Sequence, residues 1–227
     1  MQQGFQVKVE EYLIGDTTYH IRSLLNKQQY SDPDGVAEKA GIGSANWSLF
    51  GVIWPSGQVL ARCMNTHLID GLHILEVGCG LALASLVVKQ RGGDITTSDY
   101  HPMVPSFLAA NTGLNALNNI AAISGDWSVD EVESEKFDLI IGSDVLYERG
   151  HFDMLSGYID RHAKPKAEVM IVDPGRGHVG KFSRRMRQLG FSNSSERVEM
   201  LLENSEQYRG RVLTYQRGQA LSFEQWS

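Results

Sequence analysis

The fold of this 227-residue chain is decided by one stretch, LEVGCGLA, at residues 75–82. Its first residues continue an apolar run that is typical of a buried strand, and a helical pattern of apolar residues begins at Leu83. The loop between them holds Gly78 and Gly80, and glycine lets a ligand approach the backbone because it has no Cβ atom. The stretch therefore predicts a strand, a ligand-binding loop and a helix, in that order.

The alternation of short apolar runs and helical segments continues along the rest of the chain. Strands are expected at residues 73–77, 94–98, 120–124, 137–142 and 168–172, and helices at residues 83–91, 102–116, 151–162 and 179–189. Two more strands, 197–202 and 211–215, flank a turn and predict an antiparallel hairpin at the sheet edge. The predicted fold class is α/β, with a Rossmann-like, doubly wound, mostly parallel seven-stranded sheet and an antiparallel C-terminal strand.

The first fifty residues follow a different pattern. Residues 7–12 and 17–21 flank a Gly-Asp pair and predict two short strands joined by a turn. Residues 30–43 are polar and contain Pro, Asp and Gly, which predicts a loop. A helix expected at residues 52–67 then leads into the main sheet. We therefore expect a small N-terminal hairpin and loop extension at residues 1–50 and one larger domain at residues 51–227.

The composition argues against several classes of partner. The 21 basic and 27 acidic side chains leave a net charge of −6, so a nucleic acid is not expected. The longest nearly apolar run, residues 81–88, is far shorter than the ~18 residues of a membrane helix, so no membrane partner is expected. Cys63 and Cys79 are too few for a disulfide framework or a zinc site. We expect no metal and a cytoplasmic location.

The residues around the glycine loop predict the kind of ligand. A nicotinamide-dinucleotide loop would have a third glycine where Leu83 stands, and Glu76 would repel a pyrophosphate. Asp99 follows the next strand, where a carboxylate can accept hydrogen bonds from both ribose hydroxyls. A nucleoside that carries a positive charge suits these residues, and S-adenosylmethionine is such a ligand. The alternative is that Glu76 and Asp99 only cap helices.

Four segments carry a resemblance to a known family. Residues 53–60 contain a Trp-Pro step before the core, and residues 76–80 form the glycine loop. Residues 125–127 hold an Asp-Trp step, and residues 143–147 hold an Asp-x-x-Tyr motif. At these segments the chain resembles the seven-strand S-adenosylmethionine-dependent methyltransferases and, among them, the methyltransferase-16 family of protein lysine methyltransferases. The resemblance implies a methyltransferase domain at residues 51–227 with S-adenosylmethionine as cofactor.

The resemblance also implies which residues bind the cofactor. Trp127 can lie against the adenine while Asp126 accepts a hydrogen bond from its amino group, although packing in the core is the alternative for Trp127 and Trp54. The chain has Ser56 and Ala82 where related sequences often have glycine. The full set of expected cofactor-binding residues is Trp54, Glu76, Gly78, Cys79, Gly80, Asp99, Asp126, Trp127 and Ser143.

Asp144 and Tyr147 are the candidate catalytic residues. They follow the apolar run 139–141, at the carboxyl end of the expected central strand, where catalytic groups collect in open sheets. Asp144 can orient an ammonium or accept its proton, and Tyr147 offers an aromatic face and a hydroxyl. The motif lacks the paired prolines of enzymes that methylate amides or nucleobases. The alternative is that Asp144 caps the following helix and that Tyr147 belongs to the core.

These observations predict a methyltransferase that transfers a methyl group to a side-chain nitrogen, preferably that of lysine, in a protein substrate. A small-molecule amine is the second candidate acceptor, since the same core serves both reactions. A non-catalytic S-adenosylmethionine-binding sensor or scaffold is a third reading, from a different class of function. Analysis of the methylated product separates the three.

Overall fold

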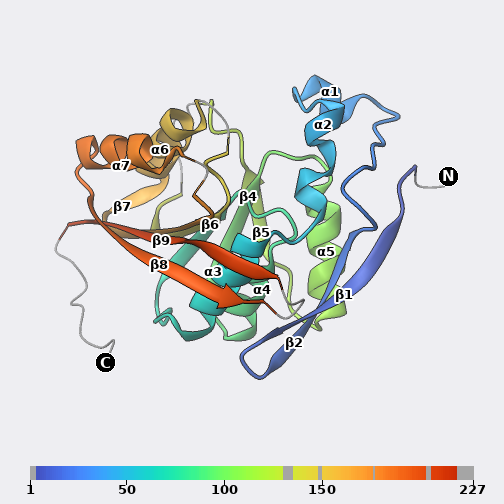
Figure 1. Ribbon diagram of the computed structural model, residues 1–227, viewed down its shortest axis with the longest axis horizontal. Coiled ribbons are helices and arrows are strands. Elements are labelled where there is room, and N and C mark those ends of the chain that lie inside the picture. Colours follow the sequence, from blue (N-terminus) through green and yellow to red (C-terminus); the bar gives the residue numbers. More distant parts are fainter. Residues whose placement is uncertain (1–3, 130–134, 148–149, 176, 203–205, 219–227) are drawn as a thin grey trace.

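The computed structural model of the protein describes residues 4–129, 135–147, 150–175, 177–202 and 206–218. A seven-stranded sheet crosses the molecule, and α6 and α7 lie together, apart from α3, α4 and α5 (Figure 1). The strands of this sheet are β3 (His73–Val77), β4 (Asp94–Asp99), β5 (Ala121–Ser124), β6 (Phe137–Ser143), β7 (Ala163–Asp173), β8 (Ser192–Leu201) and β9 (Gln207–Arg217).

The strand order confirms the predicted fold class. The order is β5-β4-β3-β6-β7-β9-β8, and the pairs from β5 to β7 are parallel. Strand β9 runs antiparallel to both β7 and β8. The larger helices are α3 (Pro55–Thr66), α4 (Leu83–Gln90), α5 (Val104–Leu114), α6 (His151–His162) and α7 (Val179–Gln188). The chain is therefore a doubly wound α/β sheet with its ligand edge at the carboxyl ends of the parallel strands.

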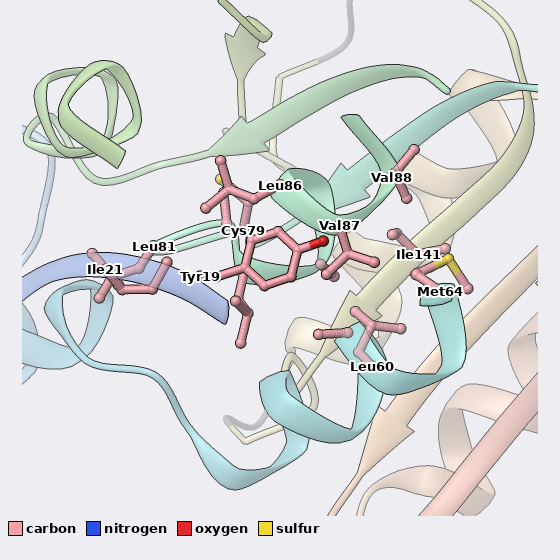
Figure 2. Packing of buried hydrophobic residues seen from close by; sticks show 14 of the residues in the cluster. Tyr19, Ile21, Leu60, Met64, Cys79, Leu81, Leu86, Val87, Val88 and Ile141 are labelled. Carbon is pink, nitrogen blue, oxygen red and sulfur yellow. The ribbon is translucent and has the colours of Figure 1, made fainter. Parts of the chain in front are cut away.

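The central strands are buried on both faces, and this divides the core into two clusters. Successive side chains of a strand point to opposite faces, so Ile74 packs in one cluster and Leu75 in the other. The first cluster includes Leu60 and Met64 of α3 (Figure 2), and the second includes residues of α6 and α7. A sheet that is covered on both faces requires the nearly continuous apolar runs that the sequence shows.

The N-terminal hairpin consists of β1 (Val7–Ile14) and β2 (Thr17–Leu24), which pair antiparallel in a separate two-stranded sheet. Tyr19 and Ile21 of β2 are buried in the same cluster as Leu60 and Leu86, as Figure 2 shows. The hairpin is therefore packed on the helices of the main sheet. The division of the chain into two units at residue 50 stays a prediction.

Two asparagines, one in α5 and one just after it, attach the hairpin to the core. Asn111 is fully buried; its Oδ1 accepts the N–H of Arg22 at 2.7 Å, and its Nδ2 donates to the carbonyl of Leu81 at 3.3 Å. Asn115, at the end of the helix, accepts the N–H of His20 at 2.9 Å and donates to its carbonyl at 2.8 Å. These amides satisfy the outer backbone edge of β2, which would otherwise be left without partners.

Several elements differ from the prediction. The expected loop at residues 30–43 contains the short helix α1 (Val36–Lys39), because Asp32 accepts the backbone N–H of Glu38 at 2.8 Å. The helix α2 (Ser44–Trp47) and the 3-10 turn η1 (Ser48–Gly51) follow it.

Strands β7, β8 and β9 are longer than predicted. Most of β8 is exposed and polar, as suits an edge strand, so its first half has no apolar pattern for a sequence to show. The start of β7 contains Pro165 and two lysines, residue types that are uncommon inside strands, so its sequence gives no strand signal there.

The asparagine contact generates a stability prediction. Asn111→Ala leaves a buried donor on Arg22 and a buried acceptor on Leu81 without partners, so we expect the free energy of unfolding to fall by about 2–4 kcal/mol. Asn118→Ala is the matched control, because Asn118 is exposed, and it should stay within about 0.5 kcal/mol of wild type. Urea denaturation measures both. Equal values for the two variants would show that the amide contacts do not stabilise the fold.

Candidate active site

A cavity of about 460 Å³ lies at the carboxyl ends of β3, β4, β5 and β6. This is the edge of a parallel sheet at which ligands bind. Every residue that the sequence analysis selected lines this one cavity, although the roles of the individual residues stay predictions. The residues are Trp54, Glu76, Gly78, Cys79, Gly80, Asp99, Asp126, Trp127, Ser143, Asp144 and Tyr147.

The loop after β3 has no room for side chains at its two glycines. Gly78 and Gly80 both have positive φ angles, of 60° and 51°. A Cβ atom on Gly78 would lie 2.8 Å from Cγ1 of Val145, and one on Gly80 would lie 3.0 Å from the carbonyl oxygen of Phe50. Substitution at either position would therefore strain the backbone and push against packed atoms.

Cys79 and Ala82 complete the loop in different ways. The backbone N–H of Cys79 donates to the carbonyl of Ser98 at 3.1 Å, and burial raises the pKa of its thiol, which stays protonated. Ala82 precedes α4 with a φ of 60°, in the left-handed region that glycine adopts at no cost. The glycine common in related sequences would therefore fit here, and the alanine accepts a small strain.

Glu76 both lines the cavity and binds the start of α4. Its Oε2 accepts hydrogen bonds from the backbone N–H of Ser85 at 3.0 Å and from the Ser85 hydroxyl. Burial raises the pKa of Glu76 to about 7, although the two bonds from Ser85 oppose the shift and Asp99 adds to it. The capping role and the cavity role therefore coexist, and the negative charge predicted for Glu76 is only partly present at neutral pH.

Asp99 connects the loops that follow two neighbouring strands. Its Oδ2 accepts the N–H of Gly80 at 2.8 Å, and its Oδ1 accepts the N–H of His101 at 2.8 Å. Burial raises the pKa of Asp99, and these backbone bonds oppose the shift. Each carboxylate oxygen has a second lone pair, so the carboxylate can still accept from a ribose.

His101 is a cavity residue that the sequence analysis did not select. Its ring is 6% exposed and stacks on Phe50 with centroids 3.9 Å apart, while Trp47 lies edge-on at 5.7 Å. Burial lowers the pKa of His101 to about 4, so the imidazole is neutral. The sequence showed only a histidine in a loop, which is usually solvated. The aromatic residues that bury it come from a segment about fifty positions away.

The cavity wall after β5 contains the Asp-Trp step. Oδ1 of Asp126 accepts the N–H of Ser128 at 3.0 Å and its hydroxyl at 2.6 Å, which shapes the turn. The half-buried Trp127 ring lies edge-on to His151, with centroids 5.5 Å apart. Nε1 of Trp127 is buried and has no hydrogen-bond partner among the residues that the structure describes. A donor in this state is expected where a ligand supplies the acceptor.

Asp144 stands where the chain leaves β6. Its φ is 56°, and its N–H donates to the carbonyl of Val172 at 2.9 Å. Helix α6 begins after Gly150 and has no side-chain cap, so Asp144 does not cap it. Tyr147 is 41% exposed and lies edge-on to His151 at 5.0 Å, so it is no core residue. Both alternatives raised for this pair are therefore wrong.

Trp54 forms part of a different wall. Its Nε1 donates to the carbonyl of Leu49 at 2.9 Å, and its ring faces the ammonium of Lys27, 4.2 Å from the ring centroid. The indole N–H is thus used to fix the turn between Leu49 and Trp54. A ligand can contact only the carbon atoms of the ring.

The sheet order, the glycine loop and the acid after the second strand define a Rossmann-like methyltransferase. The family model for lysine methyltransferases, methyltransferase-16, matches residues 42–186, and the chain belongs to this family. Its cofactor is S-adenosylmethionine. The cavity fits this group, because Gly78 and Gly80 line it without side chains and Nε1 of Trp127 offers an unused donor.

Known proteins with related sequences and folds agree with this assignment. A histidine protein methyltransferase 1 homolog from Dictyostelium discoideum is 35% identical over 108 residues, covering 45% of this chain and 35% of that protein. The EEF1A lysine methyltransferase 3 of Mus musculus is 23% identical over 142 residues, covering 59% and 60%. The chain therefore spans less than two thirds of either relative.

A solved structure supports the fold alone. The magnesium protoporphyrin IX methyltransferase of Synechocystis PCC 6803, with bound SAM, superimposes with a TM-score of 0.55 at 17% identity. The match covers 72% of this chain and 78% of that one.

Within the described residues, no three His, Cys, Asp or Glu side chains gather where they could hold a metal ion. The helices of the described part of the chain are all too short or too polar to cross a membrane.

The raised pKa of Glu76 generates a binding prediction. A proton on Glu76 competes with a cationic ligand, so we expect the affinity for S-adenosylmethionine to fall about 3- to 10-fold from pH 8 to pH 6. In Glu76→Gln this part of the pH dependence should vanish. Any pH dependence caused by titration of the ligand is the same for both proteins and cancels when they are compared. Glu38→Gln, at an exposed site on α1, is the control. Calorimetry measures each constant, and identical pH dependence in wild type and Glu76→Gln would contradict the electrostatic role.

Proposed function

We propose that this protein transfers the methyl group of S-adenosylmethionine to a side-chain nitrogen of another protein, with lysine as the preferred acceptor. The observation that carries the proposal is the position of Asp144. This carboxylate lines the cofactor cavity and also a second groove, which is walled by the N-terminal hairpin and β9. It therefore stands where a methyl donor and an acceptor from outside would meet.

Methyl transfer to nitrogen requires a neutral acceptor nitrogen, and the sulfonium donor needs no acid to activate it. When bound, S-adenosylmethionine supplies an electrophilic methyl group on a sulfonium sulfur, which departs as a neutral thioether. The acceptor nitrogen must use its lone pair to form the new bond, so a lysine ammonium must first lose a proton. Asp144 can accept that proton or hold the amine by a hydrogen bond in line with the methyl group.

The backbone around Asp144 supports a positioning role. A non-glycine residue in the left-handed region costs about 1 kcal/mol or more, and such strain collects at functional sites. The bond from its N–H to Val172 anchors the turn to β7, the next strand of the sheet. Tyr147, exposed beside His151, lies close enough in sequence and space to add an aromatic face to the same wall.

A histidine acceptor is the second candidate. The observation in its favour is the relative from Dictyostelium discoideum, whose name is that of a histidine protein methyltransferase. Histidine needs no desolvation to present a lone pair at neutral pH, because its reference pKa is about 6.5. The two acceptors therefore differ in how the rate of methyl transfer responds to pH.

The pH dependence is the first prediction from the proposed function. With a lysine acceptor, the rate of a single turnover should rise about tenfold per pH unit through the alkaline range until the bound amine is neutral. With a histidine acceptor, the rate should level off above about pH 7. The measurement uses labelled cofactor and the best substrate from a cell lysate, with mass spectrometry to name the residue. A methylated metabolite and no methylated protein would overturn the protein-acceptor proposal.

The role of Asp144 is the second prediction. Asp144→Asn keeps the size of the side chain but removes its charge, so we expect turnover to fall about 10- to 1000-fold, with little loss of cofactor affinity. Asp153→Asn, at an exposed position in the first turn of α6, is the matched control and should behave as wild type. Single-turnover rates and calorimetry separate the two effects. A variant that transfers methyl groups as fast as wild type would remove Asp144 from the reaction.

A further inference from the structure

A second groove of about 600 Å³ adjoins the cofactor cavity. The two share four lining residues, namely Val52, Ile53, Trp54 and Asp144. The rest of the groove is lined by β1, by the end of β2 and the chain that follows it, by the start of α3, by Pro174 and by the start of β9 with the residue before it. It is thus continuous with the cavity at the candidate catalytic carboxylate.

The lining of the groove mixes polar and apolar residues and carries both signs of charge. The hydroxyl of Tyr208 lies 3.2 Å from that of Ser56, and the Lys8 ammonium lies 2.8 Å from the Glu10 carboxylate. Arg209 is exposed at the start of β9. Hydrogen-bonding groups of this variety match the amides and mixed side chains of an extended peptide. The volume also exceeds what one amine needs, since pockets of roughly 300–1,000 Å³ hold drug-sized ligands.

A cation of the chain itself already occupies the junction. Lys27 lines the groove, and its ammonium lies 4.2 Å from the centroid of the Trp54 ring. Trp54 is one of the residues common to the groove and the cofactor cavity, and so is Asp144. An aromatic face and a carboxylate in one wall are the two groups that recognise an ammonium.

We propose that this groove is the acceptor channel, that it holds an extended segment of the substrate protein carrying the acceptor lysine, and that Lys27 covers the Trp54 face until the acceptor displaces it. This inference rests on the proposed function and names the path by which the acceptor reaches Asp144. Lys27 then acts as an internal competitor that weakens the binding of any acceptor that must displace it.

Blocking the groove tests the channel. Leu25 is 42% exposed and lines the groove but not the cofactor cavity, so Leu25→Trp adds bulk there without reaching the cofactor. We expect at least a tenfold loss in kcat/KM for a methylated lysate protein, through KM, with unchanged affinity for S-adenosylmethionine. Leu68→Trp is the matched control, because Leu68 is 85% exposed and lines neither hollow.

Removing the internal cation tests the displacement. A cation–π contact at an exposed site accounts for about a 2- to 5-fold change in affinity, so Lys27→Met should lower KM for the acceptor protein by that factor. Lys27→Arg keeps the cation and should restore the wild-type KM.

The outcomes separate the two proposals. If wild type methylates a protein and Leu25→Trp does so with the same KM, the channel is overturned while the proposed function stands. If Lys27→Met leaves KM unchanged or raises it, the displacement by the acceptor is overturned. If wild type binds S-adenosylmethionine and transfers no methyl group to any protein, both proposals fail together.

Discussion

The carboxylate of Asp99 is the contact on which the rest of the site depends. By accepting one backbone N–H from the loop after β3 and one from the loop after β4, it holds two neighbouring loops in a single arrangement. In this arrangement the carbonyl oxygen of Phe50 packs next to Gly80, at the place that the Cβ atom of any other residue would need. A buried carboxylate is costly unless its oxygens are satisfied, and here the backbone of the ligand loops satisfies them. The same group therefore stabilises the loops and shapes the cavity.

The segment before the main sheet completes the site from outside. Trp47 and Phe50 bury the neutral ring of His101 against the end of β4, and Trp54 forms the partition between the cofactor cavity and the second groove. The hairpin that follows the N-terminus is attached by Asn111 of α5 and walls the outer side of the groove. The loops after the parallel strands thus provide much of the first cavity, and the N-terminal residues provide much of the second groove.

The agreement between sequence and structure varies with the type of signal. Strands β3, β4 and β6 were predicted closely, because strands buried on both faces require unbroken apolar runs. The first half of β8 was missed because this exposed edge strand carries polar residues. It is a strand because its backbone pairs with β9. Every selected residue lines the cavity, since the loops that follow parallel strands meet at one edge of the sheet. The burial of His101 and the contact of Lys27 with Trp54 were missed, since the partners of these residues lie far away in the chain.

The sequence by itself determined the alternating α/β sheet, the glycine loop and the acids that line the cavity, because each depends on the local periodicity of apolar residues or on spacing within one strand-loop-helix unit. Only the tertiary structure decided that Glu76 is buried, that His101 is buried and neutral, and that Asp144 lines two adjoining hollows. These properties arise from burial and from contacts between residues distant in the chain. No local pattern encodes them, since desolvation depends on what the rest of the fold places around a group.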